Sequence, residues 1–335
     1  EGDVGEAWRI ARQLEKTYQP GQQPPEFFWL RAQLLKDGQW NLAQQTLRGV
    51  TGSKSQPQLR LLGLITLAQG LDAQSQTEPA DKAWVEAAHL ASELKPQRGA
   101  WVLHVALAQA DRQIQKDRHD QSLMTLVNAR ALAQTEKLPA LLALVQLKIA
   151  ETEAELNDWP SFSDNCQAAL DTACKLQEAW LIERICTYWV DQQMLRSTDV
   201  ASSLRCLGAL QKAEKSLQGP SRLHLLSQLA RLQALGLNQR AAGLATLDRA
   251  VDLCPSNKLE VRLLAERYML TPVSDQAGRR SQLLQMQEDL AKLGPLQPED
   301  LVARMLPAYG ILAALADTYL SEQPEQAQKL FAQAL

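Results

Sequence analysis

The sequence lacks the residue patterns from which most catalytic and metal sites are built. Only four histidines and five cysteines occur among its 335 residues. No Cys-x-x-Cys pair is present, and no histidine has a second His or Cys three or four residues away, as zinc ligands usually do. Phosphate-loop, dinucleotide-binding, GxSxG and HExxH motifs are absent as well. We therefore expect no enzyme activity, no metal site and no cofactor in this chain.

Long apolar runs and blocks of one charge are also missing. No apolar run approaches the roughly 20 residues that a membrane-spanning helix needs. The 35 basic and 38 acidic residues are interspersed and give a net charge of −3. Because no run of Lys or Arg is available to follow a phosphate backbone, we expect no direct binding of nucleic acid. The first 16 residues have neither the basic nor the apolar region of a signal peptide.

The cysteine pattern does not indicate a disulfide framework. The count is odd, and each cysteine lies in or at the end of a helical pattern: Cys166, Cys174, Cys186, Cys206 and Cys254. Free cysteine is among the most buried residue types and packs as a small apolar side chain. We therefore expect buried or half-buried reduced thiols, and a cytoplasmic or another reducing location.

What the sequence does contain is helix-forming composition with a helical apolar period. Leu, Ala and Gln dominate, whereas aromatic residues make up only 5%. Such a composition favours helices over strands. The expected helices span residues 2–18, 27–36, 40–50, 57–69, 80–94, 101–115, 119–134, 140–156, 161–176, 178–195, 197–216, 222–235, 239–253, 259–270, 276–293 and 299–319, with a last one from about residue 324. Residues 70–78 are expected to form a polar loop, the most mobile of the chain.

The expected helices come in pairs that repeat along the chain. The second helices begin near residues 2, 39, 78, 118, 159, 198, 238, 274 and 323. These starts are 36 to 41 residues apart, except the last, which follows after 49. Two antiparallel helices in a repeat near 40 residues are typical of an α-solenoid. Because each hairpin has to stack on its neighbours, we predict one all-α repeat domain over residues 1–335.

The last stretch, residues 321–335, shows the packing pattern most clearly. Ala327, Phe331 and Ala334 stand at i, i+4 and i+7, so they share one helical face. A finished repeat array usually ends in a cap with a polar outer face. We therefore expect the chain to be a fragment of a longer protein, in which at least one further helix covers this face.

The pattern resembles the tetratricopeptide-repeat family. In that family the second helix carries a small residue, an aromatic or Leu four positions later, an Ala three further on, and often a Pro five after that. The matching residues are Ala327, Phe331 and Ala334; Gly243, Leu247, Ala250 and Pro255; less completely Ala43 and Leu47, where Val50 replaces the Ala; and weakly Ala7, Ala11 and Leu14.

The family's period is about 34 residues, whereas this one is near 40. The longer period is similar to the divergent tetratricopeptide arms of large bacterial signal-transduction ATPases that activate transcription. The resemblance implies a right-handed superhelix with its first helices on the concave side. HEAT-like or other helical-hairpin repeats remain an alternative.

Candidate binding residues follow from this arrangement. Charged residues of the first helices that could line the concave surface are Arg31, Arg60, Lys148, Glu151, Glu183 and Arg184, although an ordinary solvated face is the favoured explanation for them. Eight tryptophans favour packing between helices. Trp180 and Trp189 lie nine residues apart, on opposite sides of one helix. One of these two is the better candidate for an exposed anchor.

The sequence thus favours a binding role. The first hypothesis is a scaffold that docks a peptide, a helix or a protein partner on the curved surface of the superhelix. The second is the sensor or regulatory arm of a larger ATPase-type regulator or kinase, with a small ligand or effector as the bound partner. The residues that make the contact are not specified by the pattern.

Overall fold

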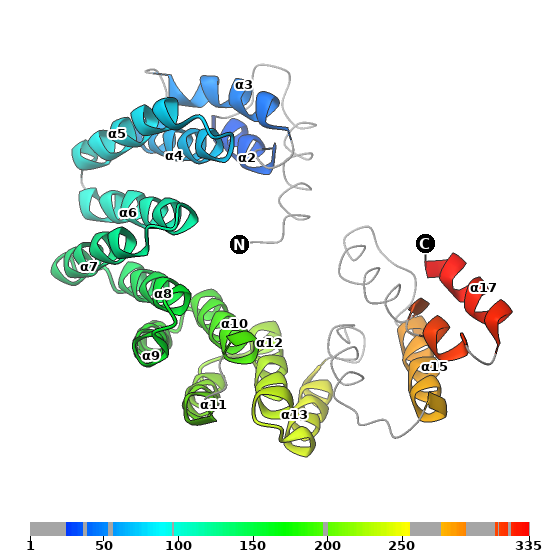
Figure 1. Cartoon of the computed structure of the whole chain (residues 1–335). Coiled ribbons are helices and arrows are strands. Elements are labelled where there is room, and N and C mark those ends of the chain that lie inside the picture. The colour runs from blue at the N-terminus through cyan, green and yellow to red at the C-terminus, as the bar shows by residue number, and fades with distance from the viewer. Residues whose placement is uncertain are drawn as a thin grey trace. The chain divides into compact units, whose positions relative to one another are not determined.

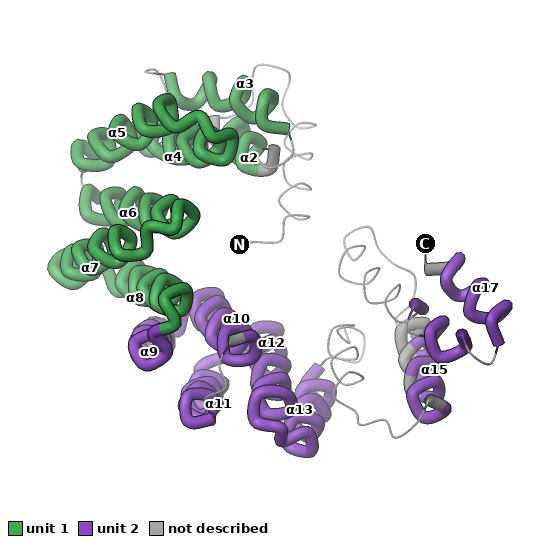
Figure 2. The backbone as a smooth tube through the Cα atoms, viewed as in Figure 1, with its two compact units in different colours: residues 1–157 green, residues 158–335 purple. Residues whose placement is uncertain are grey.

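We describe the chain from a computed structural model, for residues 25–35, 39–52, 56–95, 97–196, 200–254, 276–292, 312–313, 315–320 and 323–334. Over these residues every regular element is a helix, as the composition predicts. The predicted helices at residues 2–18 and 259–270, and most of 299–319, lie outside the described residues. The chain divides into two compact units, residues 1–157 and 158–335, which are distinguished by colour in Figure 2.

The first unit is a series of helical hairpins (Figure 1). Its helices are α2 (Pro25–Leu35), α3 (Trp40–Thr51), α4 (Pro57–Ala73), α5 (Thr77–Glu93), α6 (Arg98–Gln115), α7 (His119–Thr135) and α8 (Pro139–Glu155). Each helix packs against the next in sequence. In addition α2 packs against α4, α4 against α6, and α6 against α8. The first helices of successive hairpins therefore form a continuous layer within this unit.

The second unit continues the same alternation. Its helices are α9 (Trp159–Leu176), α10 (Ala179–Arg196), α11 (Val200–Glu214), α12 (Gly219–Arg231), a π-helical turn η1 (Leu232–Gly236), α13 (Arg240–Leu253), α15 (Gln276–Lys292) and α17 (Pro324–Ala334). Helix α10 packs against α9, α11 and α12, and α9 packs against α11. The hairpin repeat predicted from the sequence is confirmed, and the described second helices begin within two residues of the predicted positions. The single-domain organisation and the right-handed superhelix stay predictions.

The apolar faces read from the repeat pattern are buried. Ala43, Leu47 and Val50 of α3 are fully enclosed. The same holds for Leu247 and Ala250 of α13. In α17 the buried residues are Ala327 and Leu330, while Phe331 is half-buried. The terminal face is therefore turned further toward Leu330 than the i, i+4, i+7 pattern predicts.

The predicted polar loop at residues 70–78 is wrong. Helix α4 extends to Ala73, α5 starts at Thr77, and Leu71 is buried. Gly70 suggested a break in the helix but has a packing role instead. A Cβ atom at this position would lie 1.9 Å from Cζ3 of Trp40, so the glycine lets the indole of α3 lie against the backbone of α4.

Most residues with left-handed backbone in the described turns are not glycine. Several interhelical turns contain one residue in the left-handed region: Ser75, Asp117, Lys137, Asn157, Gln177 and Asn238. From Asp117 to Gln177 these positions recur every 20 residues, which is half the repeat length, so one stands at the end of each successive helix. A left-handed residue after a helix satisfies its last carbonyl groups, as the bonds from Gln76 N to Leu71 O and from Arg118 N to Gln113 O show. The sequence places a turn at Gly70 only if glycine is taken as the mark of a turn, whereas the turn here uses Ser75.

The contact between Gly70 and Trp40 predicts opposite stability effects at two helical glycines. Gly70→Ala should destabilise the chain by about 1–3 kcal/mol, because the methyl group collides with the indole of Trp40, which packs against the core. Gly49→Ala is the matched control, since a Cβ atom there meets nothing within 4 Å. It should stabilise the chain by about 0.5 kcal/mol, because alanine is the better helix former. Urea unfolding midpoints measure both, and equal shifts would contradict the packing role of Gly70.

Candidate ligand-binding cleft

The charge cluster around Asp72 is the most extensive polar arrangement we find in the described part of the first unit. The Asp72 side chain is 8% exposed. Its Oδ1 lies 2.7 Å from Lys116 Nζ and accepts a hydrogen bond of 3.0 Å from Arg112 Nη2. Its Oδ2 accepts a hydrogen bond of 2.8 Å from Trp84 Nε1 and lies 2.8 Å from Arg112 Nε. Asp72 thus joins the end of α4 to α5 and to the carboxyl end of α6.

Two cations keep the Asp72 carboxylate ionised although it is enclosed. Burial alone raises the pKa of a carboxyl group, because it penalises the charged form. Hydrogen bonds from Lys116, Trp84 and Arg112 outweigh burial, so the pKa of Asp72 is lowered. In turn, burial acts to lower the pKa of Arg112, but Asp81 and Asp72 raise it. The Arg112 guanidinium also lies over the Trp84 ring, 5.9 Å from its centroid, which is within cation–π range.

A polar cleft of about 290 Å³ lies beside this cluster. Its walls come from three successive helices and the turn between two of them: Thr77 and Asp81 of α5; Gln109, Arg112 and Gln113 of α6; Lys116 and Arg118 of the α6–α7 turn; and Gln121 of α7. The amino-terminal ends of α5 and α7 contribute to it, and neither helix has a side-chain cap. Unbonded amide groups at helix starts favour anions.

The cleft lining carries three cations and one carboxylate. Arg112 and Lys116 are engaged with Asp72, and Arg112 also with Asp81. Arg118 forms no ion pair among the described residues and is exposed. The arrangement offers one available guanidinium on a rigid wall, together with three glutamine amides. Such a set suits a carboxylate or a phosphate rather than an apolar ligand.

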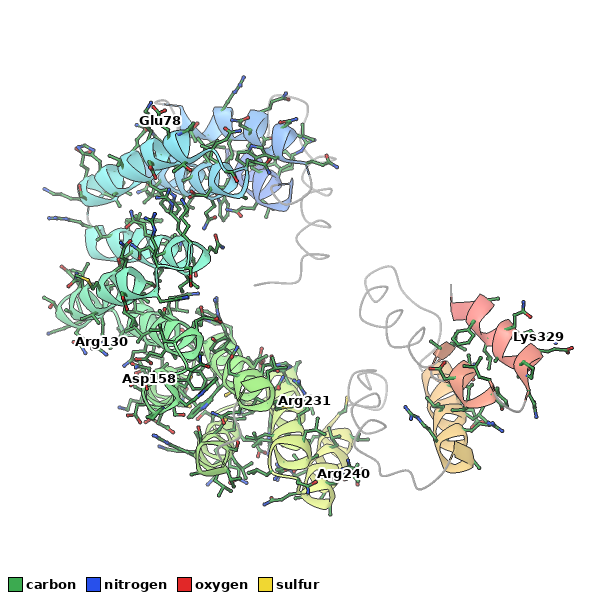
Figure 3. The ribbon with its side chains drawn as sticks, viewed as in Figure 1. Glu78, Arg130, Asp158, Arg231, Arg240 and Lys329 are labelled. Atoms are coloured by element: carbon green, nitrogen blue, oxygen red, sulfur yellow. The ribbon has the colours of Figure 1, made fainter. Side chains whose placement is uncertain are left out.

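Two of the six predicted concave-surface charges, Arg60 and Lys148, join helices to one another. Arg60 of α4 pairs with Glu86 of α5. Lys148 of α8 pairs with Asp111 of α6 at 2.6 Å and with Glu151 on its own helix. Burial acts to lower the pKa of Lys148, yet the two carboxylates raise it. In the second unit Arg231, labelled in Figure 3, pairs with Asp191 of α10 at 3.1 Å.

The remaining predicted charges lie on more open surface. Arg31 lines a second pocket of about 370 Å³ between α2 and α3, together with Phe28 and Leu42. Glu183 is half-buried and Arg184 is exposed on α10. The cleft at α5, α6 and α7 contains none of the six residues selected from the sequence. None of its wall residues was predicted, because the cleft combines the end of a first helix with a turn and the starts of two second helices, whereas the candidates came from first-helix faces alone.

The two tryptophans of α10 lie as the helical spacing predicts. Trp189 is fully buried, whereas Trp180 is 50% exposed. Trp180 Nε1 donates a hydrogen bond of 3.1 Å to Glu178 near the start of the helix. Trp180 is therefore the exposed member of the pair, although it lines neither of the two pockets described above.

The histidines and thiols show no catalytic arrangement in the described residues. His119 pairs with Asp117 in the α6–α7 turn, and His224 is 2.8 Å from the Thr187 hydroxyl. Cys166, Cys186, Cys206 and Cys254 are buried and Cys174 is half-buried, all as free thiols. Burial raises the pKa of Cys186 and Cys206 well above the usual range, which disfavours the reactive thiolate.

Among the described residues no group of three or more His, Cys, Asp or Glu side chains is placed to hold a metal ion. No helix in the described ranges combines the length and the apolar character that crossing a membrane requires.

The known proteins to which this chain shows similarity are solved structures. The sequence matches no protein-family model and no curated protein. BtubC from P. vanneervenii is similar at 14% identity and a TM-score of 0.46, over 68% of this chain and 90% of that one. The quorum sensor NprR from B. thuringiensis aligns at 13% identity and a TM-score of 0.42, over 98% of this chain and 92% of that one.

A third similar structure is the signal transduction ATPase PH0952 from Pyrococcus horikoshii, which has a tetratricopeptide repeat sensor. It aligns at 12% identity and a TM-score of 0.44, over 99% of this chain and 45% of that one. All three TM-scores are below 0.5, so these likenesses support no statement about function.

The charge cluster predicts a large stability loss on removal of its central carboxylate charge. Asp72→Asn keeps the shape of the side chain but leaves Arg112 and Lys116 facing an uncharged partner. We expect a loss of about 2–3 kcal/mol, below the roughly 3–5 kcal/mol of fully buried pairs because both cations are partly exposed. Glu78→Gln is the matched control, since the Glu78–Lys82 pair lies on the surface and should change stability by less than about 0.5 kcal/mol. Similar losses for the two variants would contradict the role assigned to Asp72.

The lowered pKa of Asp72 also predicts an acid-dependent contribution to stability. The contribution is fully present above the ordinary carboxyl pKa of 3.8 and is lost as the pH falls through the lower pKa of the folded state. The difference in unfolding free energy between wild type and Asp72→Asn should therefore be constant near neutral pH and shrink below pH 3.8. Urea titrations from pH 7 to pH 2.5 measure this difference. A gap that stays constant over the whole range would show that Asp72 is not the group responsible.

Proposed function

We propose that this chain is a helical-repeat binding module that docks a segment of a peptide or protein partner. The cleft between α5, α6 and α7 anchors an acidic group of that segment. The observation that carries the proposal is a cleft whose wall side chains are held by a network between three helices. A surface that is already ordered before binding loses little conformational entropy on binding, so most of the entropy cost falls on the partner.

The chemistry of the cleft specifies the group that it prefers. Arg118 supplies a planar guanidinium, which binds carboxylates in a bidentate manner. Glutamine amides of Gln109, Gln113 and Gln121 line the same space and can donate further hydrogen bonds. The positive ends of two helices add to the preference for negative charge. An Asp or Glu side chain, or a terminal carboxylate, meets all these conditions.

A second candidate uses the same cleft for a small anionic effector, as a sensor arm of a larger regulator would. A volume near 290 Å³ is close to the lower end of the range for small-molecule sites. The two candidates differ in how binding grows with ligand size. A protein segment gains affinity from contacts beyond the cleft, whereas a small effector makes all its contacts inside the cleft.

The proposal predicts that reversing one charge weakens the binding of an acidic probe. A fluorescein-labelled peptide of twelve glutamates should bind the chain saturably at low salt. Arg118→Glu should weaken this binding at least about tenfold, or about 1.4 kcal/mol. Arg48→Glu, on the exposed face of α3, is the matched control and should change affinity less than about twofold. Equal weakening by both variants would mean that binding is diffuse attraction, and no effect of Arg118→Glu would refute the cleft.

Ligand length separates the two candidates. If a small dicarboxylate such as glutarate displaces the peptide as effectively as longer competitors do, the effector role is favoured. If competition requires peptides of several residues, the cleft is one anchor of a longer docked segment. Fluorescence anisotropy with unlabelled competitors gives both answers in one series.

A further inference from the structure

Helix α11 has most of its large apolar side chains on the solvent side. Val200 and Leu204 are 59% and 49% exposed, and Leu207 is half-buried. These residues stand at i, i+4 and i+7 and so form one stripe. The opposite, buried face consists mostly of small residues: Ser202, Ser203, Cys206, Ala209, Leu210 and Ala213. The usual distribution of an amphipathic helix is therefore largely reversed.

Helix α9, the second helix of the preceding hairpin, provides an internal reference. Its buried residues lie forty positions earlier: Phe162, Ser163, Cys166, Ala169, Leu170 and Ala173. The two buried faces thus correspond residue by residue. On the solvent side, however, Pro160, Asp164 and Gln167 of α9 correspond to Val200, Leu204 and Leu207 of α11. The repeat itself does not require an apolar outer face. Helix α7 also exposes Met124 and Val127, eighty positions before Leu204 and Leu207, but α11 adds Val200 to this pattern.

Hydrogen bonds in the core fix the rotation of α11. Ser202 Oγ accepts from Gln193 Nε2 at 2.8 Å and lies 2.8 Å from Ser163 Oγ. Ser203 Oγ donates to Gln193 Oε1 at 3.3 Å. Rotating the helix to bury Leu204 would break these bonds and leave buried polar groups unpaired, which is costly. The exposure of the stripe is therefore a property of the packed structure.

Gly208 extends the stripe by one further turn. A Cβ atom at this position would meet nothing within 4 Å, and the backbone there is not left-handed. Neither packing nor conformation within the chain requires a glycine here, although glycine costs roughly 1 kcal/mol relative to alanine in a helix. A small residue beside an apolar stripe allows the backbone of another helix to approach closely.

The charges beside the stripe are mainly positive. The only carboxylate on α11, Glu214, is largely buried between Arg222 and Arg249. Arg205 and Lys212 pair with Asp164 and Asp171 of α9, and Lys215 follows the helix end. Together these groups comprise five cations against three carboxylates, on a chain whose net charge is −3. The surroundings of the stripe therefore attract an acidic partner.

We propose that the outer face of α11, formed by Val200, Leu204, Leu207 and Gly208, docks an acidic amphipathic helix of a partner protein. The apolar side of that helix covers the stripe, its backbone approaches at Gly208, and its carboxylates face Lys212 and Lys215. A second copy of the chain fits less well, because it would bring the same surplus of cations to the contact. This surface belongs to the second unit and does not depend on the proposed cleft.

The test uses two synthetic helical peptides of twenty residues and the intact chain. Both have leucines at i, i+3, i+4 and i+7 spacing on one face; the other positions hold Glu and Ala in one peptide and Lys and Ala in the other. Fluorescence anisotropy should show saturable binding of the Glu peptide and at least about tenfold weaker binding of the Lys peptide. Leu204→Glu should reduce affinity for the Glu peptide at least about tenfold. Val85→Glu, at a 70% exposed apolar position of α5, is the matched control and should leave it unchanged.

Gly208→Ala separates a docking role from a structural one. It should raise the urea midpoint, because alanine is the better helix former. At the same time it should lower the affinity for the Glu peptide fivefold or more. Unchanged peptide binding in Leu204→Glu, or equal binding of both peptides, would overturn the proposal. Sedimentation of a dimer that Leu204→Glu dissociates would also overturn it, in favour of self-association. Arg118→Glu should not affect binding of the Glu peptide to α11. A result that refutes the α11 surface is therefore distinct from one that refutes the cleft.

Discussion

A single buried carboxylate holds neighbouring repeats of the first unit in register. Asp72 receives hydrogen bonds from Trp84 and Arg112 and an ion pair from Lys116, so α4, α5 and the end of α6 share one polar cluster. Apolar contacts between helices are non-directional and tolerate small shifts. A charge with fixed partners does not, because any shift leaves a desolvated group unpaired. The walls of the cleft depend on this constraint, since Arg112 and Lys116 belong to both.

Contacts of this kind join neighbouring repeats in both units, with different chemistry. In the first unit Asp111 reaches Lys148 of the following hairpin. In the second unit Ser163 meets Ser202, and Asp191 meets Arg231. Each pair is separated by roughly one repeat length along the chain. The carboxylate–cation pairs connect neighbouring hairpins by charge, and the pair of serine hydroxyls fixes the rotation of α11.

The hairpin repeat was predictable because it depends on an apolar period and a helix pair length. Small residues at the second-helix positions, such as Ala43 and Ala327, mark the buried faces correctly. The cleft and the α11 surface were not predictable, because they depend on which side chains of each helix face the neighbouring helices. Asp72 was assigned to a loop because Gly70 suggested a break, whereas the actual turn uses Ser75 in the left-handed region. The reversed face of α11 likewise appears only when burial shows that serines, rather than Val200 and Leu204, face the core.

The sequence separation of the polar pairs has a kinetic consequence. The pairs that connect hairpins, from Asp72–Arg112 to Arg205–Asp164, join residues about forty positions apart. Contacts this local require little loop-closure entropy, so any hairpin with its neighbour is a possible nucleus for folding. For the same reason, interfaces that carry a force between the two ends in series would open one at a time. Such an array extends in steps of one repeat, each of which closes again independently when the load is removed.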